Sequence, residues 1–487
     1  MSIDVERLPN RFYPDFKRVI IRFFENGRER SEDLVEKVLR MEEDAVELTL
    51  TQTLREFSKR HRNISQKFLD HFEKAKKLIN NSSLKMEKIN EARKMLIGSY
   101  FSMEYSITAA AFFNPSAVDS PDQTGLSEGA KRIIVSFRAT GEGHVSSIVF
   151  HTGTISKEGE MEFEASGSYV DEAEMVKRTK YKKTTFIKKL REMNVTESIF
   201  TEVMDELGDV FIYGELLKAV KDTLARNSSS EAKKRVICQI MWLADSHYEI
   251  EFSRDTHISE RVIFPVSFSE RKGIEDARFV RFTDDDGEVS YYATYTAYDG
   301  STILPKLIVT RDFYKFEVKP LHGEGAQNKN LALFPRKING QYVMLSRVDG
   351  INSFIGFSNK LNVWEKPIKI QEPKFHWEYV QVGNAGAPIE TPEGWLLITH
   401  GVGPMRRYCL GASLLDLDDP TKEIGRLQEP LLVPKEEERE GYVPNTVYSC
   451  GSVEHNGKLY IPYGLSDTSS GFVSVDIKQL LDELKSD

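Results

Sequence analysis

The first part of the chain carries apolar side chains at helical intervals. Leu34, Val38 and Val46 recur at this spacing, and Ser31 stands before them as an N-cap residue. A second amphipathic stretch runs through residues 54–75, the pattern breaks at an Asn-Asn-Ser-Ser run, and a third stretch follows over residues 84–100. We therefore predict a helical N-terminal region over residues 1–110. Its apolar stripe needs a cover, and a second copy of the chain is one candidate, so homo-oligomerisation through this region is an expectation.

From about residue 112 the pattern changes to short strands that follow glycine-bearing turns. Each strand alternates aromatic or branched residues with other residues, as β-hairpins do. Four of the turn glycines are spaced 53, 54 and 63 residues apart, close to one propeller blade per repeat. A two-sheet sandwich is the alternative, but the regular repeat favours a five-bladed β-propeller. The hairpins lie at residues 129–138, 286–295, 339–347, 393–400 and 456–463.

The interval between the first and second hairpins is too long for one blade. It contains four stretches with helical patterns between about residues 183 and 245. We therefore predict a mainly β protein, in which a five-bladed propeller catalytic domain over residues 111–487 carries a helical insertion in its first blade.

Composition limits the classes of partner. Hydrophobic residues make up 40% and charged residues 29% of the 487 residues, as in ordinary globular proteins. The net charge of -9 argues against nucleic-acid binding, which needs a basic surface. No run reaches membrane-spanning length, and the N-terminus lacks an apolar signal region. We expect a protein that binds neither nucleic acid nor membrane.

Cysteine and histidine positions bear on redox compartment and metal binding. The three cysteines lie far apart, which argues against a disulfide framework or a zinc site and favours a reducing, cytoplasmic compartment. The histidines show no metal-ligand spacing, so a metal-dependent enzyme is a weak alternative, and we predict no metal and no cofactor. The residues concerned are Cys238, Cys409, Cys450, His144, His151, His257 and His376.

Two adjacent carboxylates, Glu275 and Asp276, lie between Gly273 and Arg278. Neighbouring side chains of a regular strand point to opposite faces, so both carboxylates reach one pocket only if the backbone turns, which Gly273 would allow. Taken alone, the stretch also fits a surface ion pair between Asp276 and Arg278.

The predicted hairpin strands end in polar residues that a propeller would bring together at one end of its channel. Two arginines and a histidine at equivalent positions indicate an anion or polyhydroxyl site. Carboxylates at such a site are the groups used for glycoside cleavage. The strand-end residues are Arg138, Tyr295, Arg347, His400 and Tyr463, with Glu275, Asp276 and Asp467 as the carboxylates.

Several motifs between about residues 112 and 476 resemble glycoside hydrolase family 130. They are Asn-Pro-Ser at 114–116, Phe-Arg-Ala at 137–139, Gly-Ile-Glu-Asp-Ala-Arg at 273–278, and the segments 333–340, 394–402, 414–420 and 443–445. The resemblance implies a five-bladed β-propeller that acts on β-mannosides. It also implies an inverting phosphorylase that yields α-mannose 1-phosphate, or a member of a smaller hydrolytic branch that acts on β-1,2-mannosides.

The resemblance also implies residue roles. Asp276 matches the proton donor, which in the phosphorylases acts through the 3-hydroxyl of the sugar. The mannosyl unit would be held by Asn114, Ser116, Arg138 and Asp467, and we add Glu275 and Arg278 as substrate-binding candidates. The positions of basic phosphate ligands fall on Lys329, Arg347 and His400.

Two positions depart from the phosphorylase pattern. Lys329 stands where the pattern has Arg, so the two-pronged guanidinium contact to phosphate is lost there. Glu390 stands where phosphorylases tend to have Lys or Arg, and its charge would weaken phosphate binding by a few kcal/mol. Inverting hydrolysis needs a carboxylate base instead, so Glu390 is a catalytic candidate, with Glu440 and Glu438 as further ones. The alternative for Glu390 is an ion pair with an arginine such as Arg406 or Arg407.

The sequence therefore predicts hydrolysis of β-1,2-linked manno-oligosaccharides. A phosphorylase with inorganic phosphate as co-substrate is the first alternative, since Arg347 and His400 are retained. A carbohydrate-binding propeller without catalytic activity is the alternative from another class.

Overall fold

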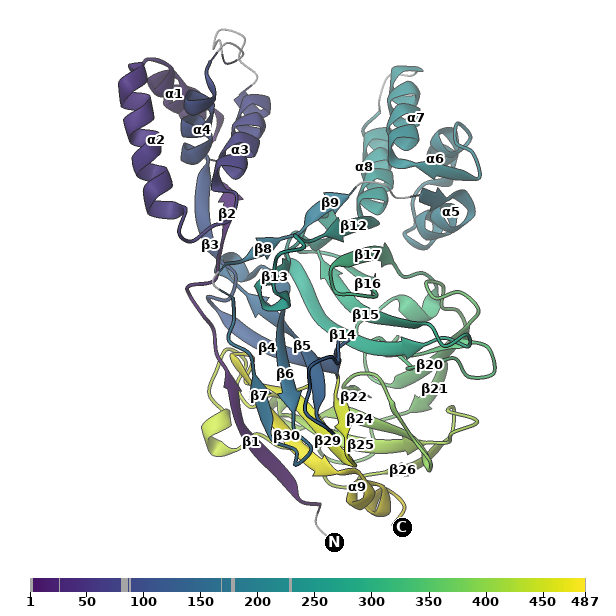
Figure 1. Cartoon of the computed structure of the whole chain (residues 1–487). Helices are drawn as coiled ribbons and strands as arrows, with labels where there is room; N and C mark the ends of the chain where they lie inside the picture. The colour runs from purple at the N-terminus through teal and green to yellow at the C-terminus, as the bar shows by residue number, and fades with distance from the viewer. Residues whose placement is uncertain are drawn as a thin grey trace.

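A computed structural model gives the fold of the chain. It describes residues 3–25, 27–79, 86, 89–167, 169–176, 180–226 and 230–486. Five sheets of four or more strands form the body, and two groups of helices stand beside it (Figure 1). The predicted strand-rich fold is confirmed.

The five sheets follow one another along the chain, and their contacts close a ring. β4 contacts β14, β15 contacts β18, β19 contacts β22, β25 contacts β27, and β29 returns to β4. Within each sheet, neighbouring strands are antiparallel apart from one short parallel pair, β8 with β13. Figure 1 shows the sheets arranged around a common centre.

The first two sheets have six strands each. The first contains β4 (Ala111–Asp119), β5 (Lys131–Thr140), β6 (Ser146–Ile155), β7 (Met161–Phe163), β8 (Asp171–Glu172) and β13 (Arg261–Ile263). The second contains β14 (Gly273–Thr283), β15 (Val289–Tyr298), β16 (Ile303–Thr310), β17 (Lys315–Pro320), β12 (Tyr248–Glu251) and β9 (Glu174–Val176).

The other three sheets are smaller. The third contains β18 (Ala332–Leu333), β19 (Tyr342–Ser346), β20 (Ser353–Ser358) and β21 (Ile368–Gln371). The fourth contains β22 (Gln381–Asn384), β23 (Ile389–Thr391), β24 (Gly394–Val402), β25 (Tyr408–Leu415) and β26 (Glu423–Arg426). The fifth contains β27 (Val447–Tyr448), β28 (Val453–His455), β29 (Lys458–Leu465), β30 (Ser469–Asp476) and β1 (Val5–Phe12).

The strands of the five predicted hairpins are β5, β15, β19, β24 and β29, one in each sheet. They are almost continuously buried because each lies between two neighbours in its sheet and between two other sheets. The repeat read from the glycine turns therefore identifies one strand of every sheet correctly.

The N-terminal helices are confirmed, with two differences. α1 begins one turn earlier than Ser31, whose hydroxyl donates to the carbonyl of Gly27 inside the helix instead of capping it. Residues 19–23 and 102–106 pair as strands within the region 1–110 that we predicted to be helical. The predicted break at 80–83 lies outside the described residues. The elements are β2 (Val19–Phe23), α1 (Arg28–Leu39), α2 (Glu43–Phe57), α3 (Ile64–Ile79), α4 (Glu91–Tyr100) and β3 (Ser102–Ser106).

The N-terminal region also supplies a strand to the body, which the helical prediction did not include. β1 lies along β30, with Val5 opposite Val475 and Phe12 opposite Ser470. Its Phe12 ring packs on Phe137, so β1 covers apolar surface that the fifth and first sheets leave open.

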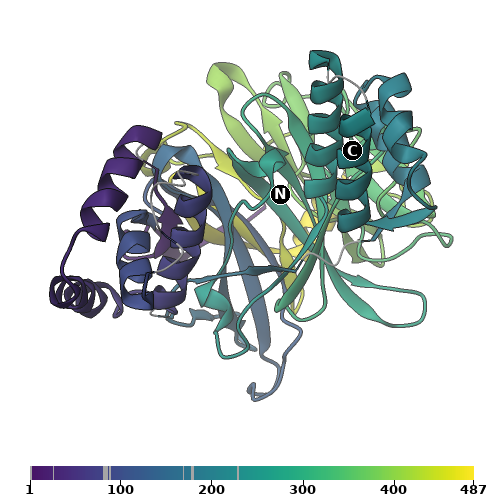
Figure 2. The same cartoon turned by 90° about the horizontal axis from the view of Figure 1, so that it is seen from above.

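The second helical group contains the predicted helices, and along the chain it lies between β8 and β13 of the first sheet. The chain leaves the sheets after β9 and returns at β12, and these two strands pair at the outer edge of the second sheet. The group contains β10 (Lys180–Lys182), α5 (Lys183–Glu192), α6 (Glu197–Met204), β11 (Val210–Ile212), α7 (Tyr213–Arg226) and α8 (Glu231–Asp245), and α9 (Ile477–Leu484) ends the chain. Figure 2 shows the two helical groups on opposite sides of the molecule.

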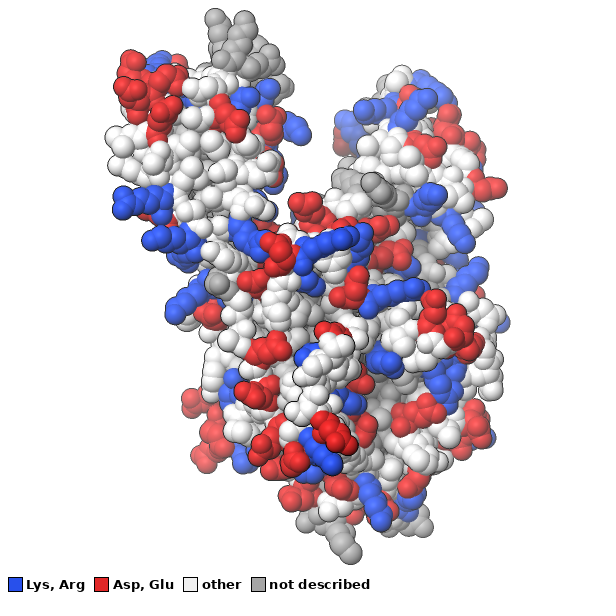
Figure 3. Space-filling view, in the orientation of Figure 1, with Lys and Arg blue, Asp and Glu red and all other residues white. Residues whose placement is uncertain are grey.

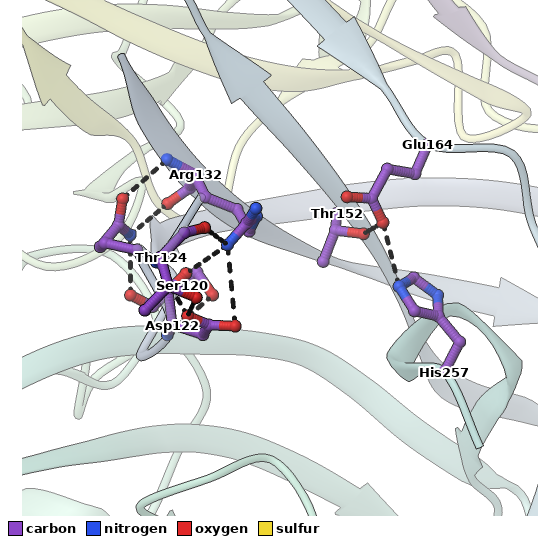
Figure 4. A network of polar contacts seen from close by, with 8 residues as sticks. Ser120, Asp122, Thr124, Arg132, Thr152, Glu164 and His257 are labelled. Atoms are coloured by element: carbon purple, nitrogen blue, oxygen red, sulfur yellow. Dashed lines mark hydrogen bonds and ion pairs between the residues drawn. The ribbon is translucent and has the colours of Figure 1, made fainter. Parts of the chain in front are cut away.

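Polar contacts tie loops to the strands of the first sheet. In the β4–β5 connection, Arg132 donates to the carbonyls of Asp122 and Thr124, and Glu164 accepts from Thr152 and pairs with His257 at 3.0 Å (Figure 4). The pair of Glu164 with His257 joins segments that are 93 residues apart, whereas the other contacts hold local loops against β5 and β6.

Positive and negative side chains are interspersed over the face drawn in Figure 3. In the described part of the chain, no helix is long and apolar enough to cross a membrane.

Candidate active site

Two backbone irregularities create the site. The pairing of β4 with β5 shifts between Phe113 and Ser116, and the pairing of β14 with β15 shifts between Glu275 and Arg278. Each shift is a bulge that turns a side chain out of the strand alternation.

Asn114 and Asp276 occupy these bulges with left-handed backbones, at φ 48° and φ 55°. Such a conformation costs of order 1 kcal/mol or more and is typical of functional sites. It lets the Nδ2 of Asn114 donate to Oδ1 of Asp276 at 2.6 Å. We expected the turn at Gly273, but it lies at Asp276 itself. Gly273 is needed for close packing instead, because a Cβ there would lie 2.4 Å from Oγ of Ser146.

The turn at Asp276 allows both adjacent carboxylates to meet one guanidinium. Arg138, from the end of β5, bonds Asp276 at 3.3 Å and Glu275 at 3.0 Å. Lys329 reaches the other oxygen of Glu275 at 2.7 Å. The structure therefore brings together five of the predicted residues, including Asn114, from the first and second sheets and the entry to the third.

Arg278 does not form the surface ion pair that the sequence also allowed. It is 4% exposed, and its guanidinium donates to the backbone carbonyl of Asp276 at 2.9 Å and to the hydroxyl of Tyr448 at 2.6 Å. It therefore supports the bulge from beneath and positions Asp276.

Arg347 and His400 meet at the third and fourth sheets. The Nη1 of Arg347 donates to Nε2 of His400 at 3.1 Å, and Nδ1 of His400 donates to the carbonyl of Asn384 at 2.9 Å. Burial, together with the charges of Arg347 and Arg278, holds the pKa of His400 well below its usual value. His400 is therefore neutral and orients Arg347, whereas we expected a basic phosphate ligand.

Arg347 keeps donor capacity for a ligand. Its Nε is buried and has no hydrogen-bond partner among the described residues. A buried donor without a partner costs of order 1 kcal/mol or more, which an anion bound beside the guanidinium would recover.

Asp467 lies in the turn after β29, also with a left-handed backbone at φ 51°. Burial and the negative charge of Asp276 raise the pKa of Asp467 to about 7, against the opposing charges of Arg138 and Arg406. Burial also acts to raise the pKa of Asp276, but Arg138 and the other cations outweigh it and hold that pKa below its usual value. Near neutral pH the two carboxyls therefore differ: Asp276 is ionised and Asp467 holds a proton much of the time.

Three other predicted residues have structural contacts. Ser116 is fully buried, and its hydroxyl accepts from the backbone N–H of Phe279, which joins β4 to β14. The hydroxyls of the other two donate to buried carboxylates, Tyr295 to Glu270 at 2.6 Å and Tyr463 to Glu438 at 2.7 Å. The predicted set of strand-end residues therefore contains both site residues, such as Arg138 and Arg347, and buried core residues, Tyr295 and Tyr463.

Glu390 is not brought to the cluster. It lies on β23 opposite Trp395 and forms a two-bond ion pair with Arg336, at 2.6 and 2.7 Å, in a position that is 42% exposed. Trp395 is five residues before His400 on β24, about 17 Å along a strand. The ion-pair partner of Glu390 is therefore Arg336, rather than the Arg406 or Arg407 that we considered.

The other two glutamate candidates differ from each other. Glu438 is buried under two bonds from Arg7 of β1, at 3.1 and 3.0 Å, and these bonds, against the effect of burial, keep its pKa below the usual value. Glu440 is exposed on the loop that continues to Val443, whose N–H donates to Ser466 beside Asp467.

Sequence reasoning missed the residues between the two halves of the site. Tyr448 links Arg278 to the ring of His400, with the ring centroids 4.9 Å apart. Asn330 and Asn384 exchange three hydrogen bonds of 2.7 to 2.9 Å and thereby fix the carbonyl that holds His400. The only signal in the sequence was that Asn330 follows Lys329. Among the described residues no cluster of His, Cys, Asp and Glu could hold a metal ion.

Comparison with known proteins finds β-mannoside phosphorylases both by family model and by sequence. A family model described as beta-1,4-mannooligosaccharide phosphorylase matches residues 230–486. A 1,2-beta-oligomannan phosphorylase of a Thermoanaerobacter species is 40% identical over 219 residues, which are 43% of this chain and 71% of that protein. A beta-1,2-mannobiose phosphorylase of Listeria innocua is 30% identical over 253 residues, 49% of this chain and 69% of that protein. A solved structure of a Listeria innocua beta-1,2-mannobiose phosphorylase with beta-1,2-mannobiose has a TM-score of 0.45 and 22% identity, and covers 77% of this chain and 92% of that chain.

Proposed function

This chain belongs to glycoside hydrolase family 130, and we propose that it is an inverting phosphorylase of β-1,2-linked manno-oligosaccharides. Membership makes the protein an enzyme that cleaves β-mannosides. The proposed reaction transfers the terminal mannosyl unit to inorganic phosphate and releases α-mannose 1-phosphate. It is the alternative of the sequence analysis, which favoured hydrolysis.

The change rests on where Glu390 lies. Hydrolysis was favoured because a carboxylate near the phosphate would repel it and could activate water. Glu390 is instead paired with Arg336 at an exposed position, so its charge is already compensated there. Glu438 is held by Arg7 and Tyr463. Both carboxylates are therefore engaged by partners within the protein, and the third candidate, Glu440, is exposed on the loop that leads to Val443.

The single observation that carries the proposal is the cationic side of the cluster. The buried Nε of Arg347 has no partner in the part of the chain that the structure describes, and His400 holds the guanidinium in place. Lys329 is 41% exposed at its side chain and binds Glu275 with one contact. Two cations with spare donors suit a phosphate dianion.

The linkage is proposed from the relatives. Two curated relatives at 38% to 40% identity, both from Thermoanaerobacter, are named for β-1,2-linked oligomannan or mannobiose. A relative named for β-1,4-mannooligosaccharides is 35% identical over 171 residues. The β-1,2 relatives match over 42% to 49% of this chain, the Listeria innocua protein at 30% identity included, against 33% for the β-1,4 relative, and this supports β-1,2 linkage.

Charge links phosphate binding to proton donation. Without phosphate, Arg138, Arg278 and Lys329 keep Asp276 ionised, a state in which it cannot donate a proton. A bound phosphate dianion would compensate part of this positive charge and so raise the pKa of Asp276. The acid would then be protonated only when the nucleophile is present, with its proton passing through the 3-hydroxyl of the mannosyl unit. Asn114 and Arg138 would orient that unit.

We further propose that the ring of five sheets is a five-bladed β-propeller with the cluster at one end of its channel. Residues 1–110 and 111–487 would be the helical N-terminal region and the catalytic domain, with the second helical group, about 183–245, as an insertion. Cytoplasmic location and pairing of two copies through the N-terminal helices stay predictions.

The test is incubation of the purified protein with β-1,2-mannobiose, with and without inorganic phosphate. We expect α-mannose 1-phosphate only when phosphate is present, and no product from the Asp276→Asn variant. Equal release of mannose with and without phosphate would restore the hydrolase reading. Binding of mannobiose without turnover, in wild type and variant alike, would support the carbohydrate-binding alternative.

A further inference from the structure

A cavity of 920 Å³ lies between the second helical group and the second sheet. α5 and α8 form one wall, and the β15–β16 turn, β16 and the segment before Lys329 form the other. Residues that line it include Met193, Cys238, Trp242, Phe268, Pro305 and Gln327.

The lining suits a neutral polyhydroxylated ligand. Phe268 is 53% exposed, and Trp242 is only partly buried, so two aromatic rings are available. The same cavity is lined by Gln239 and Gln327, whose amides can donate and accept hydrogen bonds together. Sugars need this combination, because their C–H faces pack on aromatic rings while their hydroxyls need paired donors and acceptors.

Charged residues of the cavity are mostly engaged within the protein. Lys189 binds Glu192 at 3.1 Å and the carbonyl of Leu321 at 2.8 Å. The carboxylate of Asp299 accepts from the backbone N–H groups of Ser301 and Thr302, both at 2.8 Å. The cavity therefore offers little free charge to an ionic ligand, which argues for a neutral one.

Three chain segments connect the cavity to the catalytic cluster. Gln327 precedes Lys329 by two residues, and Asp299 is three residues beyond Thr296, which pairs with Glu275. Three strand residues span about 10 Å. The Nε of Arg271 donates to the carbonyl of Asp299 at 2.6 Å, and its guanidinium lies 4.4 Å from the ring of Phe268. The cavity is thus about two sugar-sized steps from the cluster, on rigid supports.

We propose that this cavity is a distal subsite that binds sugar units of a longer β-mannoside, about two units from the bond that is cleaved. The inference rests on the proposed function for its substrate class. Because the second helical group builds one wall, this group would set the preference of the enzyme for chain length.

The first experiment compares substrates of different length. In Phe268→Ala we expect kcat/KM for a β-1,2-mannohexaose to fall about tenfold, because one aromatic contact is lost, while kcat/KM for mannobiose stays unchanged. Phe57→Ala, at an exposed phenylalanine of α2, is the matched control and should change neither value. Equal effects of Phe268→Ala on both substrates would overturn the proposal.

The second experiment does not depend on turnover. Cys238 is exposed and lines the cavity, whereas Cys409 and Cys450 are buried, so a maleimide should react at Cys238 first. In the Asp276→Asn variant, which should not cleave its substrate, mannohexaose should slow this labelling at least threefold and mannobiose should not. If mannohexaose binds the variant but does not slow the labelling of Cys238, the proposal is overturned.

The two experiments separate this inference from the proposed function. If wild type forms no mannose 1-phosphate from mannobiose, the proposed function fails, whatever the labelling shows. If mannobiose is phosphorolysed but neither chain length nor Cys238 protection responds, only the distal subsite fails.

Discussion

Arg347 provides the sharpest test of phosphate binding. Replacement by Ala removes the guanidinium whose Nη1 binds His400 and whose Nε is buried without a partner among the described residues. A hydrogen bond to a charged group contributes about 1.5–3 kcal/mol. At about 1.4 kcal/mol for each factor of ten, the loss of one or two such bonds predicts a rise of about 10- to 100-fold or more in the KM for phosphate.

The assay is the initial rate of mannose 1-phosphate formation at fixed, saturating mannobiose over a wide phosphate range. The KM for mannobiose should change much less, because Arg138 and Asn114 are untouched. Arg347→Lys should fall between wild type and Arg347→Ala, since it keeps the charge but loses the planar fork. Arg336→Ala, which removes an arginine of the exposed pair with Glu390, is the control. An unchanged KM for phosphate in Arg347→Ala would refute this reasoning.

Three further predictions concern the carboxylates. Glu390→Gln should change kcat by less than twofold, because an exposed pair with Arg336 is remote from the cluster; a loss of 100-fold in steady-state assays would return Glu390 to the mechanism. Asp467 has a pKa raised from 3.8 to about 7, so its contribution to stability is complete below about pH 4 and is lost as pH rises to 7. In urea unfolding, the wild type should therefore lose up to about 4 kcal/mol of unfolding free energy between pH 4 and 8, and Asp467→Asn should not show this loss. Lys306→Met breaks the fully buried pair with Glu270, 2.6 Å long, and should lower the unfolding free energy by about 3–5 kcal/mol in the same assay, whereas an unchanged midpoint would show that the pair is not essential.

Local patterns were sufficient for much of the fold. Glycine turns followed by alternating strands identified β5, β15, β19, β24 and β29 because a two-residue period and a turn are properties of neighbouring residues. The helices of both groups were found for the same reason. The pairing of β1 with β30 was not found, since it joins residues more than 450 positions apart and depends on which edge the last sheet leaves open.

The site shows the same division. Glu275, Asp276 and Arg138 were identified from charge and motif, and the structure brings them together. The conformation that unites them was assigned to Gly273, yet it belongs to Asp276, because the bulge is imposed by pairing with β15 and by Arg278 beneath it. A left-handed aspartate has no signature in the sequence alone.

Glu390 shows why charge in a motif is insufficient evidence of function. The negative charge of Glu390 favoured hydrolysis in the sequence analysis. Its ion-pair partner Arg336, however, comes from a segment 54 residues away, before β19. Strand pairing placed the two together on an exposed surface. The neutral state of His400 likewise follows from burial and from the Arg347 donor, neither of which the sequence displays.

The central claim is that phosphate, not water, attacks the mannosyl unit, and product analysis in heavy-oxygen water tests it most directly. The enzyme is mixed with β-1,2-mannobiose and inorganic phosphate, and the first turnovers are followed by phosphorus NMR and mass spectrometry. The account predicts the α-anomer of mannose 1-phosphate and no heavy oxygen in either sugar product beyond the rate of spontaneous exchange. Free mannose that carries one heavy oxygen, formed at the same rate without phosphate, would contradict it.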